Sequence, residues 1–412
     1  MARNNWREKF DLPPLFWLTA LIVLINSISF TVIIPLIYPY AKQFGLSDLQ
    51  AGLLTTAFAL SQFIGTPILG RLSDRLGRKY ILVFSLVGTV VANLLASVAG
   101  VAWVLFAARI LDGLTGGNTA VASAVISDVT TPQQRPKAFG IFSATLGLGF
   151  VIGPILSYLG QQLPTLPGIN SLGMSFLLSA AIAAVAVLLT LLFLPETASS
   201  TQGNFQLSWS DFAIAKIAKS ATRPKLSRLF ILTFLNGCTF TIFAFAFQPF
   251  FLNILQQDAK NLAIMFALVG LLGFTSQIFF LEPLSNKFNL INIIAVTLAV
   301  RGITFLLIPT FPIYGAFIII LVVLGMVNAF PMALIDTVLS LNAKPQEQGE
   351  ILGINSSYLS ISNAIAPVIS GLLVSLSYTI PFWITGGLTI LVAGFAYQLK
   401  SQFKSSKAKV NV

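Results

Sequence analysis

Residues 70–79 read GRLSDRLGRK and form a short basic segment between two long apolar runs, one ending near Leu69 and the next beginning at Tyr80. The segment contains a single acid, Asp74, among four basic residues. Basic residues are concentrated in the cytoplasmic loops of membrane proteins, where they set the orientation of the flanking helices. The segment therefore predicts a cytoplasmic loop that joins two membrane-spanning helices.

The composition of the whole chain indicates a membrane protein. Hydrophobic residues make up 56% of its 412 residues and charged residues only 9%, whereas about 25% are charged in an average soluble protein. The mean hydropathy is +0.88. A helix needs about 20 apolar residues to cross a bilayer. We therefore predict an all-α integral membrane protein with twelve transmembrane helices, at residues 16–40, 50–69, 80–99, 101–127, 138–160, 173–194, 228–253, 261–282, 290–309, 312–338, 350–374 and 381–399.

The net charge of +11 comes from basic residues scattered over short loops, so we expect contact with the lipid bilayer and not with nucleic acid. The chain has no histidine and one cysteine, Cys238, which leaves no internal disulfide and no His/Cys metal site. It contains no GxxxxGK[ST] phosphate-binding loop, which disfavours an ATP-driven pump. We expect no metal and no cofactor.

The distribution of lysine and arginine predicts that both termini are cytoplasmic. In that orientation twenty of the 24 basic residues lie inside, Lys42 and Lys260 lie outside, and Arg109 and Arg301 fall within spans. The longest polar stretch follows the sixth span and divides the chain in two. We expect a six-helix bundle over residues 1–198, a cytoplasmic linker over 199–226 and a second six-helix bundle over 227–412.

The two halves also show signs of a duplication. Several residues recur in the loop and span that follow the fourth and the tenth helices, always at the same separation along the chain. A parallel repeat of this kind gives two similar bundles related by a pseudo-twofold axis, with the substrate site between them near the middle of the membrane. The pairs are Pro132 with Pro345, Gln133 with Gln346, Gly140 with Gly353, and Pro154 with Pro367.

Four segments resemble motifs of the major facilitator superfamily of transporters. Residues 70–79 are similar to its loop between helices 2 and 3, and RILDGLTGG (109–117) to its helix-4 motif. GIFSATLGLGFVIGP (140–154) is similar to the helix-5 motif of its drug:proton antiporters, and LPET (194–197) to the end of its helix 6. The resemblance implies a monomeric secondary transporter in a bacterial inner membrane. It would export small, amphipathic, drug-like organic compounds by alternating access, coupled to protons.

Two other functions stay open from the sequence. A facilitator or symporter for an anionic metabolite would suit the two arginines within spans, Arg109 and Arg301. A membrane-embedded enzyme is disfavoured, because neither a nucleophile–base pair nor a set of metal ligands is visible.

By the same resemblance, the basic loop belongs to a cytoplasmic gate. Asp74 would face the N-terminus of the eleventh span, where the helix dipole favours an acid, and Arg78 and Asp128 would complete a charge cluster. The alternative is a set of solvated loop charges worth about 0–1 kcal/mol each. The expected gate residues are Gly70, Asp74, Arg75, Gly77, Arg78, Lys79 and Asp128.

Glycines remove side chains from part of the fifth span. Gly147, Gly149 and Gly153 would let neighbouring helices approach closely, and Pro154 removes a backbone donor and bends the helix. We expect this helix to form a seam that stays shut or slides during transport. Tight packing without a functional role is the alternative.

Three charges lie well inside spans, where charges are costly and usually functional. Arg109 and Asp112 are three residues apart and can pair on one helix face. We expect Asp112, the only acid placed near the middle of the membrane, to carry the proton and Arg109 to modulate it, the alternative being a structural ion pair. Arg301 has no acid near it in sequence, so its partner is either Asp112 or an anionic group on the substrate.

The remaining site candidates are aromatic and polar. Phe243, Phe247 and Phe250 share one face of the seventh span and predict a cavity for an amphipathic molecule, although such a face can also meet lipid. Tetracycline-type pumps of the family carry an acid in helix 1 and another in helix 9, and Asn26 and Arg301 stand at the corresponding positions here. Further polar candidates are Gln248, Asn328 and Asn355.

Overall fold

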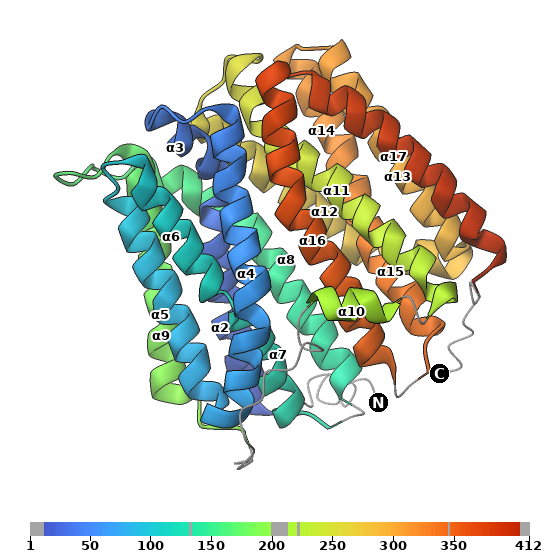
Figure 1. The fold of residues 1–412 in the computed structure, drawn as a ribbon, viewed down its shortest axis with the longest axis horizontal. Helices are drawn as coiled ribbons and strands as arrows, with labels where there is room; N and C mark the ends of the chain where they lie inside the picture. Colours follow the sequence, from blue (N-terminus) through green and yellow to red (C-terminus); the bar gives the residue numbers. More distant parts are fainter. Residues whose placement is uncertain (1–11, 132–133, 199–212, 221–222, 345–346, 404–412) are drawn as a thin grey trace, which may run out of the picture.

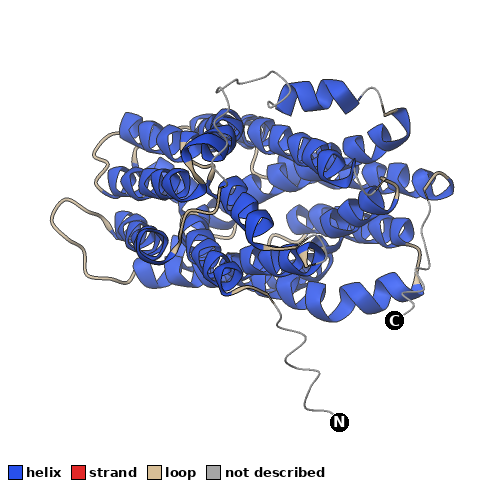
Figure 2. Cartoon of the chain, turned by 90° about the horizontal axis from the view of Figure 1, so that it is seen from below, coloured by secondary structure: helices blue, strands red, loops and turns tan. Residues whose placement is uncertain are grey.

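The computed structural model describes residues 12–131, 134–198, 213–220, 223–344 and 347–403, and all regular structure in these ranges is helical (Figures 1 and 2). Eleven helices in the described part are long and apolar enough to cross a membrane. The all-α membrane fold predicted from the sequence is confirmed. Two of the duplicated pairs, Pro132 with Pro345 and Gln133 with Gln346, lie outside the described residues.

Two groups of helices lie side by side (Figure 1). The first contains α2 (Pro14–Val32), η1 (Ile34–Leu36), α3 (Ile37–Gln43), α4 (Asp48–Leu76), α5 (Arg78–Ser97), α6 (Ala102–Leu114), α7 (Asn118–Val129), α8 (Arg135–Gly160) and α9 (Ser171–Phe193). The second contains α10 (Ala213–Ser220), α11 (Pro224–Asn253), α12 (Ala259–Lys287), α13 (Leu290–Thr310), α14 (Tyr314–Asn328), α15 (Phe330–Leu341), α16 (Gln348–Leu376), α17 (Ile380–Gln398) and η4 (Leu399–Ser401). We call them the first and second bundles.

Three of the expected spans are interrupted. The first breaks around Pro35, which lacks a backbone donor, and the tenth breaks at Ala329, two residues before Pro331. The expected fourth span over 101–127 consists of two helices, because α6 ends at Leu114 and α7 begins at Asn118. The break contains Gly116 and Gly117, whose high conformational freedom weakens a helix interior.

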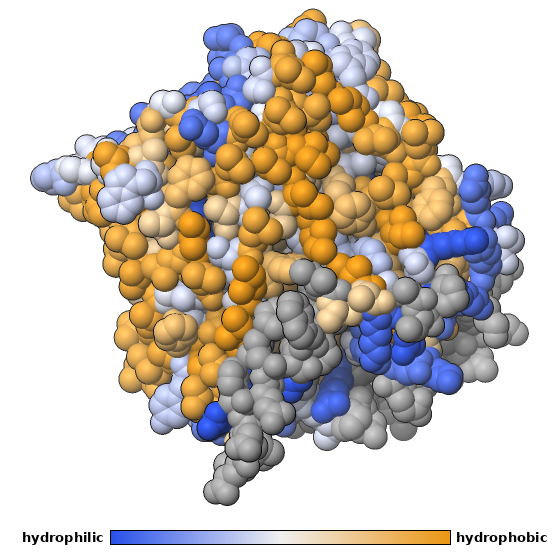
Figure 3. Space-filling model, viewed as in Figure 1, coloured by the Kyte–Doolittle hydropathy of each residue, from blue (hydrophilic) through white to orange (hydrophobic). Residues whose placement is uncertain are grey.

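The surface suits a lipid environment. Figure 3 shows hydrophobic residues over the middle of one face, with hydrophilic residues gathered at the upper edge and at the lower right. Large apolar side chains on the outer helices are among the most exposed, including Trp103, Leu192, Ile319 and Leu391. An apolar surface of this extent is not stable in water, so it marks the face that contacts lipid.

The two bundles are packed together at one end and separated at the other. The largest hydrophobic cluster lies at the end that contains α3 and joins side chains of both bundles, such as Leu36 and Tyr38 of the first and Phe250 of the second. The other three clusters each stay within one bundle. We call the separated end, which carries residues 70–79, the basic end. The prediction of a loop over these residues was wrong, because α4 continues to Leu76 and α5 begins at Arg78, with Gly77 alone between the two helices.

The segment between the bundles contains a short helix. We expected residues 199–226 to be a linker, and within it α10 packs against α16. Arg223 donates to Glu347 Oε2 at 2.9 Å, and Lys219 lies 3.0 Å from Glu350. The hydrogen bond raises the pKa of Arg223 and lowers the pKa of Glu347, so both stay charged at neutral pH. These contacts hold α10 to the second bundle at the basic end.

Candidate functional site

A central cavity of about 520 Å³ lies between the two bundles. Its walls come from α2, α4, α6 and α8 of the first bundle and from α11, α12, α14 and α16 of the second. Nine phenylalanines line it, together with a few polar side chains, which is the usual composition of a site for an organic molecule. The polar lining residues are Thr55, Gln62, Arg109, Thr241, Gln248, Gln277, Asn328 and Asn363.

The cavity continues toward the basic end. A second hollow of about 470 Å³ shares Ala59, Gln62 and Asn363 with the first, and its walls reach Asp74 on α4 and Gly353 on α16. An added Cβ at Gly70 or at Gly353 would meet nothing within 4 Å. The central cavity is therefore accessible from the basic end.

The opposite end is closed by direct contact between backbones. A Cβ added at Gly52 of α4 would lie 3.3 Å from the Cα of Gly371 and 3.2 Å from the carbonyl carbon of Pro367, both on α16. The main-chain N–H of Tyr38 donates to Gln248 Oε1 of α11 at 3.4 Å, and its hydroxyl donates to Asp48 at 2.6 Å. Glycine at positions 52 and 371 lets α4 and α16 approach more closely than any side chain would permit.

Arg109 and Asp112 form a buried ion pair. Arg109 Nη1 lies 3.0 Å from Asp112 Oδ2, and each residue is only 4% exposed. The guanidinium also lies over the ring of Phe58, 4.2 Å from its centroid. Arg109 lines the central cavity and Asp112 does not, so the arginine separates the carboxylate from the cavity. The pairing expected from the three-residue spacing is therefore present.

Arg301 does not pair with an acid. Its Nη2 donates to Asn236 Oδ1 at 2.8 Å and its Nη1 to Asn328 Oδ1 at 3.2 Å, and the residue is 1% exposed. Asp112 bonds Arg109 instead, so of the two partners considered for Arg301 the structure excludes Asp112. The reason is topological, since Asp112 lies behind Arg109 within the first bundle. Arg301 is connected to the cavity lining by its hydrogen bond to Asn328.

Two of the polar candidates lie away from the cavity walls. Asn26 accepts a hydrogen bond from Asn118 Nδ2 at 3.0 Å and joins α2 to the start of α7. Asn355 donates to Asp336 Oδ1 at 2.8 Å and joins α16 to α15. Neither is among the residues that line the two hollows, so neither faces a bound molecule in this conformation.

The aromatic face of α11 is turned inward. Phe243 and Phe247 line the central cavity with Gln248, whereas Phe250 is fully buried against Phe317 and Phe382. The alternative, that this face meets lipid, does not hold. The rings of Phe243 and Phe247 thus form part of a continuous aromatic wall.

The glycines of the fifth span serve two different contacts. Added Cβ atoms would lie 2.7 Å from Ser27 Cβ at Gly149 and 2.8 Å from Thr31 Cβ at Gly153, so these two glycines hold α8 against α2 within the first bundle. Gly147 faces the cavity, and a Cβ there would lie 3.5 Å from the ring of Phe274 on α12. Pro154 also lines the cavity.

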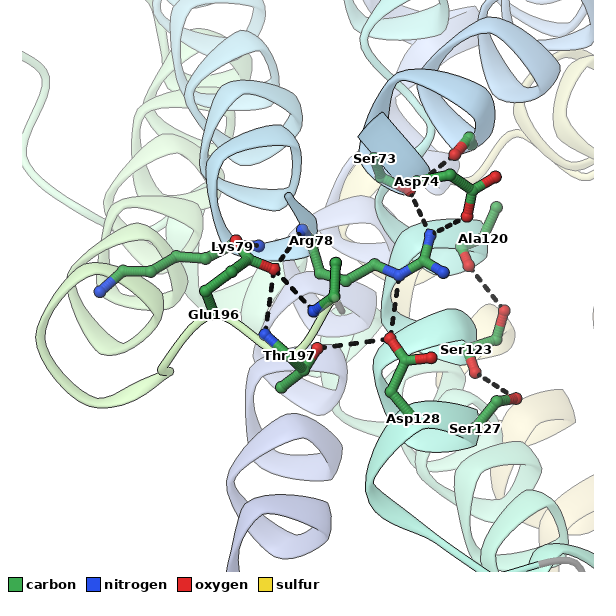
Figure 4. Close-up of polar contacts among 12 residues, drawn as sticks. Ser73, Asp74, Arg78, Lys79, Ala120, Ser123, Ser127, Asp128, Glu196 and Thr197 are labelled. Atoms are coloured by element: carbon green, nitrogen blue, oxygen red, sulfur yellow. Dashed lines mark hydrogen bonds and ion pairs between the residues drawn. The ribbon is translucent and has the colours of Figure 1, made fainter. Parts of the chain in front are cut away.

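A charge cluster surrounds Arg78 at the basic end (Figure 4). Arg78 lies 2.5 Å from Asp74 and 3.0 Å from Asp128, and donates to Ser73 Oγ at 2.7 Å. All four residues belong to the first bundle, and the second hollow lies between Asp74 and α16. Asp74 and the α16 residues Gly353 and Ser356 thus line the same hollow in this conformation.

Glu196 is a member of this cluster that the sequence did not reveal. Its carboxylate accepts from the main-chain N–H groups of Arg78 at 2.7 Å and Lys79 at 3.2 Å, at the start of α5 (Figure 4). Gly77 has a φ of 106°, and a Cβ there would collide with the carboxylate. The glycine of the loop motif is thus required both by its backbone angle and by Glu196. The sequence signal that could have identified this residue was the acid of the LPET segment (194–197), which is Glu196 itself.

We expect Glu196→Gln to destabilise the protein by about 1 kcal/mol, because it replaces a carboxylate that caps the positive end of α5. The midpoint of thermal unfolding of the purified protein measures this change. Glu282→Gln makes the same substitution at an exposed position on α12 and serves as the control. An equal shift in the two variants would show that the cap contributes nothing.

The described residues contain no cluster of three or more His, Cys, Asp or Glu residues that could hold a metal ion. The polar groups of the site are instead suited to binding by hydrogen bonds and to pairing of charges. The gate candidates Arg75 and Lys79 lie beside the Arg78 cluster, on α4 and α5.

Comparisons with known proteins agree with this architecture. The model of the Major Facilitator Superfamily matches residues 19–229 and 229–410. Multidrug resistance protein 1 of Bacillus subtilis (strain 168) is 28% identical over 353 residues, which cover 85% of this chain and 87% of that protein. The class H tetracycline resistance protein of Pasteurella multocida is 27% identical over 389 residues, 92% of each chain.

A solved structure shares the fold. It is that of a bacterial homolog to the human lysosomal transporter Spinster, in an inward-facing and unoccupied conformation. The TM-score is 0.76 at 16% identity, over 94% of this chain and 97% of that one.

Proposed function

Since this chain belongs to the major facilitator superfamily, we propose that it exports small, amphipathic, aromatic organic compounds from the cell by alternating access. A membrane-embedded enzyme is no longer an alternative, because the family consists of transporters. The observation that carries the proposal is the central cavity, which is aromatic, lies between two bundles and opens at one end only. The similarity to multidrug and tetracycline resistance proteins supports export as the direction.

We further propose that the basic end is cytoplasmic, in a cell membrane, and that the protein works as a monomer. The ends of α4 and α5 at this side carry Arg71, Arg75, Arg78 and Lys79, and the positive-inside bias places such basic connections in the cytoplasm. The conformation described here is then open to the cytoplasm, which is where an exporter collects its substrate. Both termini would also lie in the cytoplasm.

The function can be tested in inverted membrane vesicles that contain the protein. A panel of fluorescent aromatic compounds is offered from outside the vesicles, which corresponds to the cytoplasm, and accumulation is followed after energisation. We expect energy-dependent accumulation of at least one compound, and none in vesicles that contain Gly52→Leu, whose closed end is disrupted. Equal passive entry in both preparations would contradict export.

Proton coupling through Asp112 is part of the proposal. We expect Asp112→Asn to abolish accumulation against a gradient while substrate exchange continues, because exchange requires no net proton movement. Asparagine keeps the size of the side chain and an oxygen that can accept from Arg109, but it removes the counter-charge of a buried arginine. The thermal midpoint of the variant is therefore measured first, and transport is scored only in protein that is folded. The measurement is proton flux during substrate movement in proteoliposomes.

Asp336→Asn is the matched comparison, since Asp336 is a second carboxylate within a span helix of the described structure. Retention of uphill transport and proton flux in Asp112→Asn would show that Asp112 is structural. If Asp336→Asn alone lost uphill transport and proton flux, the proton would pass through the second bundle.

A facilitator or symporter for an anionic metabolite remains the second candidate, because Arg109 faces the cavity and Arg301 reaches it through Asn328. The two functions differ in the direction of net movement. Accumulation of an anion in the cytoplasmic direction, without export of uncharged compounds, would favour this candidate.

A further inference from the structure

The polar groups of the central cavity are unbalanced in charge. Among the described residues that line it, none is Asp, Glu or Lys, and Arg109 is the one charged side chain. Its partner Asp112 is 3.0 Å away but outside the lining, so the positive end of the ion pair is the end that faces the cavity. A bound molecule therefore meets a cation and no carboxylate.

Three of the five amide side chains in the described cavity lining have their oxygen bound to a protein donor. Gln248 Oε1 accepts from the main-chain N–H of Tyr38, and Asn328 Oδ1 accepts from the guanidinium of Arg301. Neither donor can accept a hydrogen bond, which fixes the oxygen and nitrogen positions of these two amides. The oxygen of Asn363 likewise accepts from a hydroxyl group of α11. In these three side chains the amide nitrogen is the group left for a substrate. Gln62 is the exception, because its Nε2 donates to the carbonyl oxygen of Gly116 at 3.3 Å.

An aromatic cavity does attract cations through the faces of its rings. Here the face of Phe58 is already occupied by the guanidinium of Arg109, at 4.2 Å. A substrate cation would also lose its hydration without gaining a carboxylate, and it would be repelled by Arg109 in a medium of low dielectric constant.

We propose that the central cavity selects planar aromatic compounds that carry hydrogen-bond acceptor oxygens, whether neutral or anionic, and rejects organic cations. This inference rests on the proposed function, since it defines the substrate class of the same cavity. The phenylalanine walls receive the ring system, and the amide nitrogens and Arg109 receive the oxygens. The absence of a carboxylate in the lining acts as the element that excludes cations.

Three probes with one ring system test the selection. They are 2-naphthoate, the neutral 2-acetylnaphthalene and the cationic 2-naphthyltrimethylammonium. We expect the first two to bind the purified protein, measured by equilibrium binding, and the cation to bind at least about tenfold more weakly. Binding of the cation as tightly as the others, or binding of none of the three, would overturn the inference.

Two sets of variants identify the groups responsible. Gln277→Glu places a carboxylate in the lining and should improve binding of the cation by about tenfold, whereas the uncharged Gln277→Met should not. Because Arg109 is a cation, naphthoate should bind more tightly than the neutral ketone, and Arg109→Lys, which keeps the charge, should keep this preference. The double variant Arg109→Gln/Asp112→Asn, which leaves no unpaired charge, should lose that preference. An unchanged order of affinities in Gln277→Glu and in the double variant would contradict the assignment.

The test separates this inference from the proposed function. Export by inverted vesicles is scored with a broad panel, and selectivity is scored by binding to the purified protein. Export of cations together with tight cation binding would overturn the substrate class and leave the exporter intact. Selective binding without energy-dependent export would support the substrate class and overturn the exporter.

Discussion

Replacing Gly52 by leucine is expected to abolish transport while leaving the protein folded. The position lies where α4 meets α16 at the closed end, and an added Cβ would lie 3.3 Å from the Cα of Gly371. Overpacking of this kind typically costs about 1–3 kcal/mol, which is enough to shift a two-state equilibrium about 5- to 150-fold. We therefore expect the closed end to open and the conformation described here to become the minor one.

The measurement combines transport in vesicles with the accessibility of a cysteine introduced in the cavity, in a Cys238→Ser background. In Gly52→Leu the cysteine should react faster from the side opposite the basic end. Gly394→Leu is the control, because a Cβ at that glycine would meet nothing within 4 Å. Wild-type transport by Gly52→Leu would mean that this contact is not the closure.

Gly153→Leu is expected to abolish transport by a different route. Gly153 packs against Thr31, whose hydroxyl donates to the carbonyl oxygen of Gly149 at 2.6 Å, so a leucine would force α8 away from α2 within the first bundle. The chain should still insert, but its thermal midpoint should fall, since such overpacking costs about 1–3 kcal/mol.

Two further variants make this prediction specific. Gly140→Leu, on the same helix but with open space around the added side chain, should transport normally. Thr31→Gly combined with Gly153→Leu should recover part of the lost stability, because the glycine removes the side chain with which the leucine would clash. A wild-type rate for Gly153→Leu alone would show that α2 and α8 do not need this close contact.

Much of the fold was predictable because its signals are local. Apolar runs of about 20 residues give the spans, and the basic loops give the orientation. The break in the fourth span was not predicted, because Thr115–Gly117 reads as an ordinary small-residue stretch unless the neighbours that pack against it are known. Gly117, for example, approaches the side chain of Leu69 on α4.

The site was predictable only in part, because its contacts join distant parts of the chain. The Arg109–Asp112 pair follows from helix geometry, and the structure contains it. The partners of Arg301 do not follow, since Asn236 and Asn328 come from two other helices. Glu196 is separated from Arg78 by more than a hundred residues, and no periodicity of the sequence connects them.

Alternating access is the central claim, and paired spin labels test it most directly. One pair, at Ala124 and Ser356, spans the hollow at the basic end, and the other, at Gln43 and Ser375, spans the closed end, with Cys238 replaced by serine. Distances are measured by double electron–electron resonance in wild-type protein and in Gly52→Leu. We predict that in Gly52→Leu the basic-end distance shortens while the opposite distance lengthens. If the two distances stay unchanged, or if both lengthen together, the bundles do not alternate about the central cavity.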